Sequence, residues 1–300
     1  MGKIAFVFAG QGAQAPGMGR EFFESSDSAR NVFETADTVR PGTSDQCFNS
    51  TEEELQKTIN TQPCLYTVEM AIAAAVEEAG FKASMCAGFS LGELSALTYA
   101  GVMNLSDGLR IVKARAEFMQ QCALEHDTSM AAVIKLTNDQ INEICSRFEN
   151  VYPVNYNCPG QTSVSGDAEQ MLLFADAVKE AGGRAKVLKV NGAFHSPYMN
   201  SAAENFKNEL AGFSFNDPQI PVYSNYTGGL YEGSDIKMNL SAQVNNPVRW
   251  ETIVRDMIYK GADTFVELGP GKTLTGLIKR ISSDVKLINV SVPADIEKLK

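Results

Sequence analysis

The chain of 300 residues contains only two histidines, one tryptophan and six cysteines. Neither histidine lies at ligand spacing from another metal-binding residue type, and no two cysteines form a Cys-x-x-Cys pair. Because zinc sites need such spacings, we expect no metal. A chain of this size does not need disulfides, so we expect free thiols in the reducing cytoplasm. The cysteines stand at positions 47, 64, 86, 122, 145 and 158.

Basic residues and long apolar runs are also scarce. Lys and Arg number 26 against 36 Asp and Glu, which gives a formal net charge of −10. A nucleic-acid-binding chain would need a basic face toward the phosphates. The longest apolar run, residues 70–76, is far shorter than the about 20 residues that span a bilayer. We therefore expect neither a nucleic acid nor a membrane as partner. Nothing in the sequence encodes an oligomeric state, and a monomer is our expectation.

The apolar residues alternate between the periods of strands and helices, and 44% apolar with 21% charged residues is typical of a globular chain. Residues 3–9 form an apolar run before a glycine-rich turn. It is too short for a signal peptide and predicts a buried strand. A short helix ending at Ile59 has capping-box spacing after Ser50 or Thr51. The other elements expected up to residue 126 are helices at 21–37, 61–78, 91–100 and 106–124 and a strand at 84–88.

The pattern changes after residue 126. Strands at 130–136, 151–156, 162–166 and 184–190 and helices at 138–148 and 169–181 give the order of a ferredoxin-like unit. The α/β alternation then resumes, with helices at 198–210, 250–259 and 273–281 and strands at 221–225, 263–268 and 286–289. We predict an α/β domain of residues 1–126 and 192–300, with residues 127–191 inserted as a ferredoxin-like α+β subdomain.

Two glycine-rich segments resemble nucleotide-binding motifs, but the residues around each of them argue against nucleotide binding. Residues 10–15 satisfy G-x-G-x-x-A, but Pro16, Gly17 and Gly19 interrupt the helix that a dinucleotide site requires. Residues 269–273 end like a phosphate loop, but Val266 stands where its first glycine should be. Neither NAD nor ATP is implied, and we expect no cofactor.

Gly88-Phe89-Ser90-Leu91-Gly92 has the spacing of a nucleophile elbow, between an expected strand and an expected helix. The glycines allow a sharp turn that exposes the Ser90 hydroxyl, and the N–H of Leu91 is placed to stabilise an oxyanion. The alternative is a purely structural role, in which the segment is a tight turn and Ser90 caps an ordinary helix.

A nucleophilic serine needs a base, and histidine suits this near neutral pH. His126 lies among charged residues at the expected domain boundary, where a solvated linker residue is the better interpretation. His195 lies where the chain re-enters the main domain, though a packed or capping histidine is the alternative there. Glu267 is the nearest acid for a triad and could equally be a structural anchor. A dyad in which a backbone group orients the imidazole remains open.

Several segments in order resemble the malonyl-CoA:acyl-carrier-protein transacylase family of fatty-acid and polyketide synthesis. They cover nearly the whole chain: residues 8–14, 88–93, 112–115, 155–157, 192–195, 243–248 and 267–272. The resemblance implies a hydrolase-like α/β domain with an inserted ferredoxin-like subdomain.

By the same resemblance, Ser90 is the nucleophile and His195 the base, and the backbone N–H groups of Gln11 and Leu91 form the oxyanion hole. Arg115 would bind the free carboxylate of the malonyl group, and a guanidinium can do so with two parallel hydrogen bonds. The alternative is an Arg115 that pairs with Glu117 or Glu93 on a helix surface. The remaining substrate-binding residues implied are Gln243, Asn155, Asn157 and Phe194, whose ring should crowd an α-methyl group.

The sequence departs from the family at Phe89, where relatives often carry histidine. That position flanks the nucleophile and is not the base, so we expect catalysis to survive. The substrates implied are malonyl-CoA and acyl-carrier protein. Because carrier proteins are acidic, docking would need a local basic patch, for which the residues considered are Lys179, Arg184, Lys186, Lys189, Lys279 and Arg280.

Three rival hypotheses share parts of this pattern. A serine thioesterase would use the same elbow and has no need of Arg115. A silent binding module would keep the cleft without acylating Ser90. A transferase serving a polyketide synthase in trans would use the same chemistry with another carrier.

Overall fold

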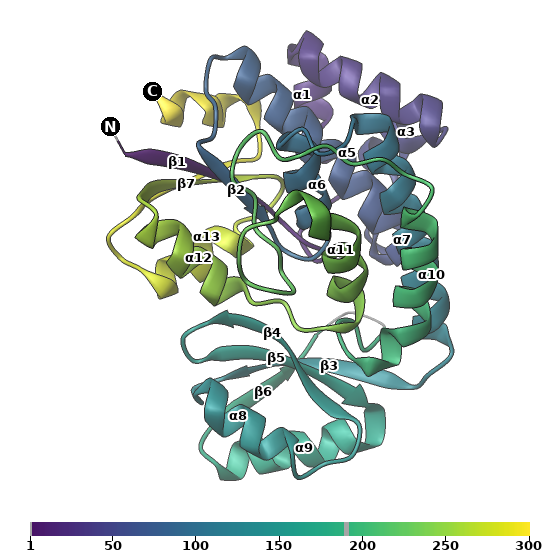
Figure 1. The fold of residues 1–300 in the computed structure, drawn as a ribbon, viewed down its shortest axis with the longest axis vertical. Coiled ribbons are helices and arrows are strands. Elements are labelled where there is room, and N and C mark those ends of the chain that lie inside the picture. Colours follow the sequence, from purple (N-terminus) through teal and green to yellow (C-terminus); the bar gives the residue numbers. More distant parts are fainter. Residues whose placement is uncertain (1, 189–191) are drawn as a thin grey trace.

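A computed structural model describes residues 2–188 and 192–300 of the chain, which form two sheets with helices around them (Figure 1). The first sheet is parallel and has the order β2-β1-β7-β8. Its β1 is an apolar strand that is buried at both faces along most of its length, as expected for a central parallel strand. The strands are β1 (Lys3–Phe8), β2 (Met85–Gly88), β7 (Ala262–Leu268) and β8 (Lys286–Val290).

Helices cover this sheet and extend away from it on the side of β2 (Figure 1). They are α1 (Arg20–Ser25), α2 (Asp27–Val39), α3 (Thr43–Asn49), α4 (Glu52–Gln56), α5 (Thr58–Glu78), α6 (Gly92–Tyr99), α7 (Leu105–Leu124), α10 (Asn200–Leu210), α11 (Ile236–Asn245), α12 (Trp250–Tyr259) and α13 (Thr273–Ile281), with short 3-10 segments at Pro197–Met199, Gly233–Asp235 and Pro293–Leu299. None of the helices in the part of the chain that the structure describes is long and apolar enough to cross a bilayer.

The second sheet is antiparallel, with the order β4-β5-β3-β6 and helices α8 and α9 on one face (Figure 1). This is the strand order of a ferredoxin-like unit, so the predicted fold class is confirmed. The last strand was expected to reach residue 190, but β6 ends at Val187; Lys189 and Val190 lie outside the described residues. The elements are β3 (Thr128–Ile134), α8 (Asn138–Cys145), β4 (Val151–Cys158), β5 (Gln161–Asp167), α9 (Ala168–Glu180) and β6 (Arg184–Val187).

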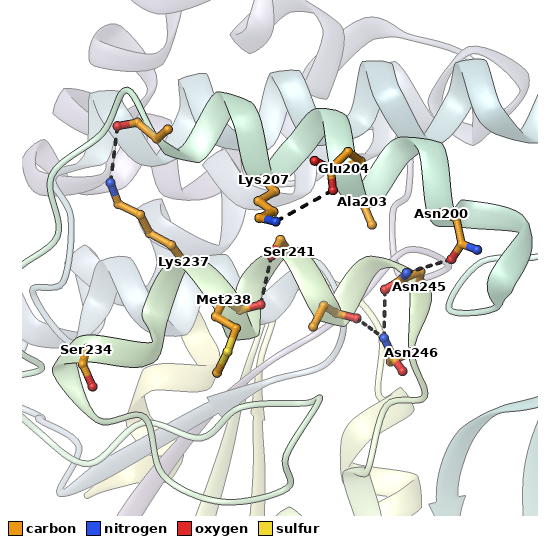
Figure 2. Close-up of a pocket in the computed structure, with 12 residues that line it drawn as sticks. Asn200, Ala203, Glu204, Lys207, Ser234, Lys237, Met238, Ser241, Asn245 and Asn246 are labelled. Atoms are coloured by element: carbon orange, nitrogen blue, oxygen red, sulfur yellow. Dashed lines mark hydrogen bonds and ion pairs between the residues drawn. The ribbon is translucent and has the colours of Figure 1, made fainter.

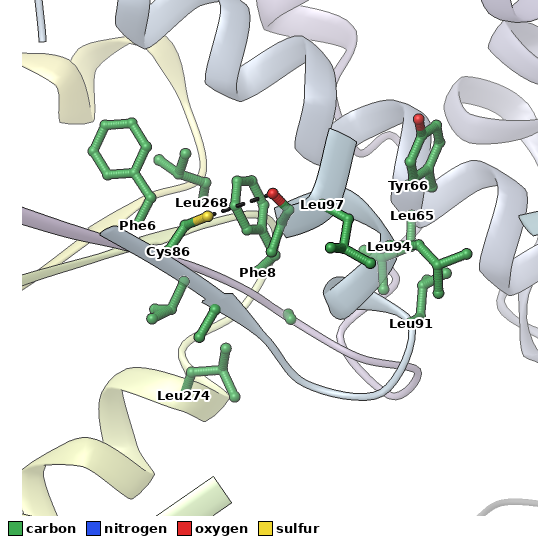
Figure 3. Packing of buried hydrophobic residues seen from close by; sticks show 14 of the residues in the cluster. Phe6, Phe8, Leu65, Tyr66, Cys86, Leu91, Leu94, Leu97, Leu268 and Leu274 are labelled. Carbon is green, nitrogen blue, oxygen red and sulfur yellow. Dashed lines mark hydrogen bonds between the residues drawn. The ribbon is translucent and has the colours of Figure 1, made fainter. Parts of the chain in front are cut away.

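The main core covers both faces of the parallel sheet, and the part around β1, β2 and α6 is drawn in Figure 3. Phe6 and Phe8 of β1 both pack on Tyr99, with ring centroids 5.3 and 5.9 Å apart. Cys86 of β2 lies beside them, and its thiol donates to the carbonyl of Ala96 in α6 (3.4 Å). These contacts fix α6 against the carboxyl end of β2, which is where the elbow turns.

Several expectations about local structure were wrong. The helix expected at 21–37 is two helices, because the Ser26 side chain accepts from the N–H of Ala29 and caps α2. The helix expected to start at 61 starts at Thr58 and contains Pro63; packing of α5 on α2 and α7 outweighs the one hydrogen bond that the proline removes. Ser106 is not the cap of α7, since Asn104 accepts from the N–H of Asp107.

Another error concerns the segment after α10. No strand forms at 221–225 among the described residues; Val222 makes an isolated bridge to Cys86 and Tyr223 one to Leu230. The backbone N–H of Asn225 instead donates to a side chain of α6. The helix α11 was not predicted, although Ile236, Leu240 and Val244, its buried apolar residues, recur at the four-residue spacing of a helix face.

Candidate active site

Ser90 stands on a sharp turn between β2 and α6, with φ at 54°. The two glycines of the motif are required by close backbone contacts. A Cβ on Gly88 would lie 1.8 Å from the backbone of Gly92, and one on Gly92 would lie 2.1 Å from the carbonyl oxygen of Phe8. Left-handed backbone is costly for a serine, so the surrounding structure must hold this conformation. The turn presents the Ser90 hydroxyl at the carboxyl end of the sheet.

The Ser90 hydroxyl lies against the imidazole of His195, with 2.8 Å between Oγ and Nε2. The other ring nitrogen, Nδ1, lies 2.8 Å from the carbonyl oxygen of Gln243. A carbonyl can only accept, so Nδ1 carries the hydrogen and Nε2 offers its lone pair to the serine. His195 has φ at 61°, and its N–H donates to the carbonyl of Val244 (3.2 Å), which fixes the loop. The orienting group is thus a backbone carbonyl and not an acid.

The other sequence candidates for this role lie in different surroundings. Glu267 accepts hydrogen bonds from the N–H groups of Leu274 and Thr275, at 2.9 and 2.8 Å, and so caps α13 as a structural anchor. His126 is exposed and packs edge-on against Tyr198. Neither is bonded to the serine or to its histidine.

Gln11 and Leu91, the residues expected to supply the oxyanion hole, both line the pocket beside Ser90. Leu91 precedes the first turn of α6, and Gln11 lies in the turn after β1. Within the described residues, neither N–H donates to another group of the protein. Two free N–H groups beside a nucleophile are what an oxyanion needs.

Arg115 of α7 reaches the serine from the other side and is 1% exposed. One of its terminal nitrogens, Nη2, lies 3.2 Å from Ser90 Oγ and 2.6 Å from Gln243 Oε1, and Nη1 donates to Gln62 Oε1 (2.8 Å). Burial lowers the pKa of Arg115 to about 10, so it is still charged near neutral pH. A position on a helix surface beside Glu117 is excluded by this burial. A buried cation bonded to two neutral amides is suited to receive an anion.

Ser90, Arg115 and His195 line a pocket of about 90 Å³, which lies between the two sheets. Asn155 of β4 and Phe194 line it together with Ser90 and Arg115. It adjoins an outer hollow of about 360 Å³, which shares Asn155 and is also lined by Asn157. Gln243 is fully buried and supports the site from behind without lining either space.

A wider hollow of about 660 Å³ lies between α10 and α11, and contains none of the predicted site residues (Figure 2). Its walls carry Lys207, Lys237 and Met238, and at one end Asn200 accepts from Asn245 (2.8 Å). The pocket beside Ser90 is thus distinguished by its cluster of polar groups and not by its size. No group of three or more His, Cys, Asp and Glu side chains that could hold a metal ion occurs in residues 2–188 and 192–300.

The sequence did not predict several residues of the site. Asn225 accepts from the N–H of Ser90 (2.6 Å) and donates to the carbonyl of Gly88 (2.7 Å). Glu93 accepts from Asn225, Tyr231 and Gln243. The sequence signal available for Glu93 was its place in the first turn of the helix after the elbow. Asn225 carries none, since it lies 135 positions from the serine.

The chain is similar to known proteins along nearly its whole length. The sequence matches the acyl transferase domain family over residues 5–292. It is 38% identical to the malonyl CoA-acyl carrier protein transacylase of Bacillus subtilis (strain 168) over 304 residues, covering 99% of this chain and 96% of that relative.

Solved structures are similar along the whole chain. The malonyl CoA-acyl carrier protein transacylase of Clostridium perfringens Atcc 13124 superposes with a TM-score of 0.96 at 39% identity, covering 99% of this chain and 96% of the other. A type II PKS acyl-carrier protein in complex with its malonyl-transacylase gives a TM-score of 0.95 at 35% identity, with 99% and 98% covered. The chain therefore belongs to the acyl transferase domain family.

Proposed function

We propose that the chain transfers a malonyl group from malonyl-CoA to the phosphopantetheine thiol of an acyl-carrier protein, through a malonyl ester on Ser90. The observation that carries the proposal is the contact of one hydroxyl with two groups. Ser90 Oγ lies 2.8 Å from the His195 nitrogen that lacks a hydrogen and 3.2 Å from the guanidinium of Arg115. A nucleophile and a cation for the acyl carboxylate thus meet at one atom.

The chemistry follows from these positions. His195 Nε2 takes the hydroxyl proton as Ser90 Oγ bonds to the thioester carbonyl carbon, and the N–H groups of Gln11 and Leu91 hold the oxyanion. The carbon–sulfur bond then breaks, and the proton on His195 passes to the sulfur of the departing CoA. The carrier thiol then gives its proton to His195 as its sulfur bonds to the ester carbonyl carbon. The bond from that carbon to Ser90 Oγ breaks, and His195 returns the proton to Ser90 Oγ. Arg115 would hold the malonyl carboxylate throughout, away from attacking water.

The names of similar proteins support the two substrates. The relatives cited above are malonyl CoA-acyl carrier protein transacylases, and one similar structure is a complex with a type II PKS acyl-carrier protein. We therefore propose supply of fatty-acid synthesis as the role, with a carrier of a polyketide synthase as the second candidate. The six cysteines are free and buried, which supports a reducing compartment, the cytoplasm.

A covalent adduct tests the proposal directly. Incubation with malonyl-CoA alone should add one malonyl group to the peptide that contains Ser90, because the first half-reaction needs no carrier. Mass spectrometry of the digested protein measures this, and added carrier protein should remove the label as malonyl-carrier. Acetyl-CoA is the matched control and should label poorly. Labelling of another residue would contradict the proposal, and release of free malonate faster than transfer would indicate a thioesterase.

The basic residues considered for carrier docking do not all share one face. Lys186 is paired across the second sheet with Ala132, and Ala132 with Ser163. Paired residues point to the same face, and Ala132 and Ser163 line the outer hollow, so Lys186 lies on that face. Lys279 is exposed at the end of α13, another wall of the hollow.

Of the other basic residues considered, two lie near Lys186 and Lys279 and two are left out of the proposed patch. Arg184 lies two positions from Lys186 on the same strand, and Arg280 donates to Gln161, which also lines the hollow. Lys179 lies on α9, which covers the opposite face, and Lys189 lies outside the described residues. We propose the patch of Arg184, Lys186, Lys279 and Arg280 as the docking surface.

Charge reversal tests this docking surface. The double variant Lys186→Glu/Lys279→Glu should slow transfer to the acidic carrier by roughly tenfold at low salt, because electrostatic steering raises association rates. Acylation of Ser90 by malonyl-CoA should change little. The matched control is Lys179→Glu, on the opposite face, which should leave both steps unchanged. Equal slowing of both half-reactions in the double variant, or the same loss in the control, would contradict the patch.

A further inference from the structure

Ser90 is held in its strained conformation by two side chains from distant segments. Asn225 Oδ1 accepts from the N–H of Ser90 (2.6 Å), and Gln243 Nε2 donates to the carbonyl oxygen of Ser90 (2.7 Å). These two hydrogen bonds thus fix the backbone on both sides of the Ser90 Cα atom. A serine with φ at 54° needs such support, because this region is sparsely populated by residues with a side chain.

Both of these residues are bound by one carboxyl group, that of Glu93. Its Oε1 accepts from the N–H of Asn225 (3.1 Å) and from the hydroxyl of Tyr231, and its Oε2 accepts from Gln243 Nε2 (2.6 Å). Glu93 is fully buried in the first turn of α6, three residues after the nucleophile. No step of the proposed chemistry uses this carboxyl group.

Gln243 connects Glu93 to the rest of the site. Its amide hydrogens face two acceptors, Ser90 O and Glu93 Oε2, while its Oε1 faces a donor, Arg115 Nη2 (2.6 Å). This pattern fixes the orientation of the amide, since a flip would oppose acceptor to acceptor and donor to donor. The backbone carbonyl of the same residue accepts from His195 Nδ1.

From these contacts we infer that Glu93 is a positioning residue for the proposed acyl transfer: its ionised carboxylate holds Asn225 and Gln243, and through them Ser90, His195 and Arg115. The inference rests on the proposed function. It requires the carboxylate to be ionised, because its three neighbours all present donors. Of these only the Tyr231 oxygen could accept a proton from Glu93, and protonation would weaken the bond from Gln243.

The ionisation state of Glu93 therefore matters to the rate. Burial raises the pKa of Glu93 to about 7, while the hydrogen bonds from Tyr231 and Gln243 and the charge of Arg115 oppose that rise. The titratable groups around it are Tyr231, whose pKa burial raises far above neutral pH, and, across Gln243, Arg115 and His195. Burial and the charge of Arg115 lower the pKa of His195 to about 4, so it is neutral where Glu93 titrates. Acylation should then lose rate below about pH 7 through Glu93.

The test measures single-turnover acylation of Ser90 by malonyl-CoA between pH 5.5 and pH 8.5, with melting temperatures. Glu93→Gln keeps the acceptor for Asn225 and Tyr231 but turns an NH₂ toward the NH₂ of Gln243. We expect the acylation rate at pH 8 to fall by about 10²-fold, because a small misplacement of the reacting groups has a cost of this size. We also expect the acid limb of the pH–rate profile, the fall in rate below about pH 7, to disappear.

Tyr231→Phe is the second variant and removes one donor from the carboxylate. It should reduce the rate less than Glu93→Gln does, and should move the acid limb to higher pH, because the lost hydrogen bond favoured the ionised form. Absence of a Ser90 adduct in the natural protein would refute the proposed function. If the natural protein is labelled, then a rate that stays constant down to pH 5.5, a Glu93→Gln rate like that of the natural protein, or an unchanged pH dependence in Tyr231→Phe would overturn the inference. The inference would also be overturned if the acylation rates of the variants fell only in proportion to their melting temperatures.

Discussion

Replacement of Ser90 by alanine is expected to abolish the acyl adduct and to slow malonyl transfer by at least about 10⁴-fold. The expected loss is large because the proposed route passes through an ester on this oxygen. Each polar contact of the hydroxyl is to a group with a proposed role, His195 as the base at 2.8 Å and Arg115 as the cation at 3.2 Å. Single-turnover labelling and steady-state transfer to a carrier protein measure the two effects.

His195→Ala should cause a loss of similar size, since the serine has no other base within hydrogen-bonding distance among the described residues. The double variant should be no slower than either single variant, because the two side chains act as one unit. Additive losses would mean that they act in separate steps. Ser90→Ala has no hydroxyl at position 90, so any label that remains in this variant must lie on another residue. Melting temperatures of the three variants show whether the fold survives.

The sequence was a good guide to the parts of the site that depend on local order. The elbow spacing around Ser90 predicted a strand, a sharp turn and a helix, and the structure has all three. The periodicity of apolar residues also predicted α12 and α13 at their observed bounds. In these segments the buried residues recur at three and four positions, so local pattern and tertiary packing agree.

The sequence was a poor guide where one residue supports another from far away. Asn225 lies at the end of an expected strand, yet it works by a side-chain hydrogen bond to Ser90. Gln243 stands on a helix that was not predicted, and the resemblance gave it a role without showing its contacts with Glu93 and Arg115. Such contacts arise from tertiary packing, which no periodicity in one segment encodes.

Loss of selectivity for malonyl over acetyl groups is the expected result of replacing Arg115 by alanine. The guanidinium is buried, charged and bonded to the amides of Gln62 and Gln243, and no carboxylate contacts it directly in the described part of the chain. Its Nη2 lies 3.2 Å from Ser90 Oγ, so the carboxylate of a malonyl ester on that oxygen can reach it. An acetyl ester has no such group and leaves the cation unpaired.

The size of this effect follows from the cost of losing a buried charge pair. Removing one partner costs about 2–5 kcal/mol, which corresponds to roughly a 30- to 4,000-fold change in rate. We expect kcat/KM for Ser90 acylation by malonyl-CoA to fall by a factor in this range in Arg115→Ala, while the value for acetyl-CoA falls less or rises. The ratio of the two values is the decisive quantity, since a general loss of folding lowers both.

Arg115→Lys separates the charge of the side chain from its geometry. A lysine ammonium keeps the positive charge but cannot form two parallel hydrogen bonds to a carboxylate. It would also have to replace the donors that Arg115 supplies to both Gln62 and Gln243. If the planar guanidinium matters, the lysine variant should discriminate between malonyl and acetyl groups better than the alanine variant and worse than the natural protein. Selectivity equal to that of the natural protein in Arg115→Ala would mean that another group binds the acyl carboxylate.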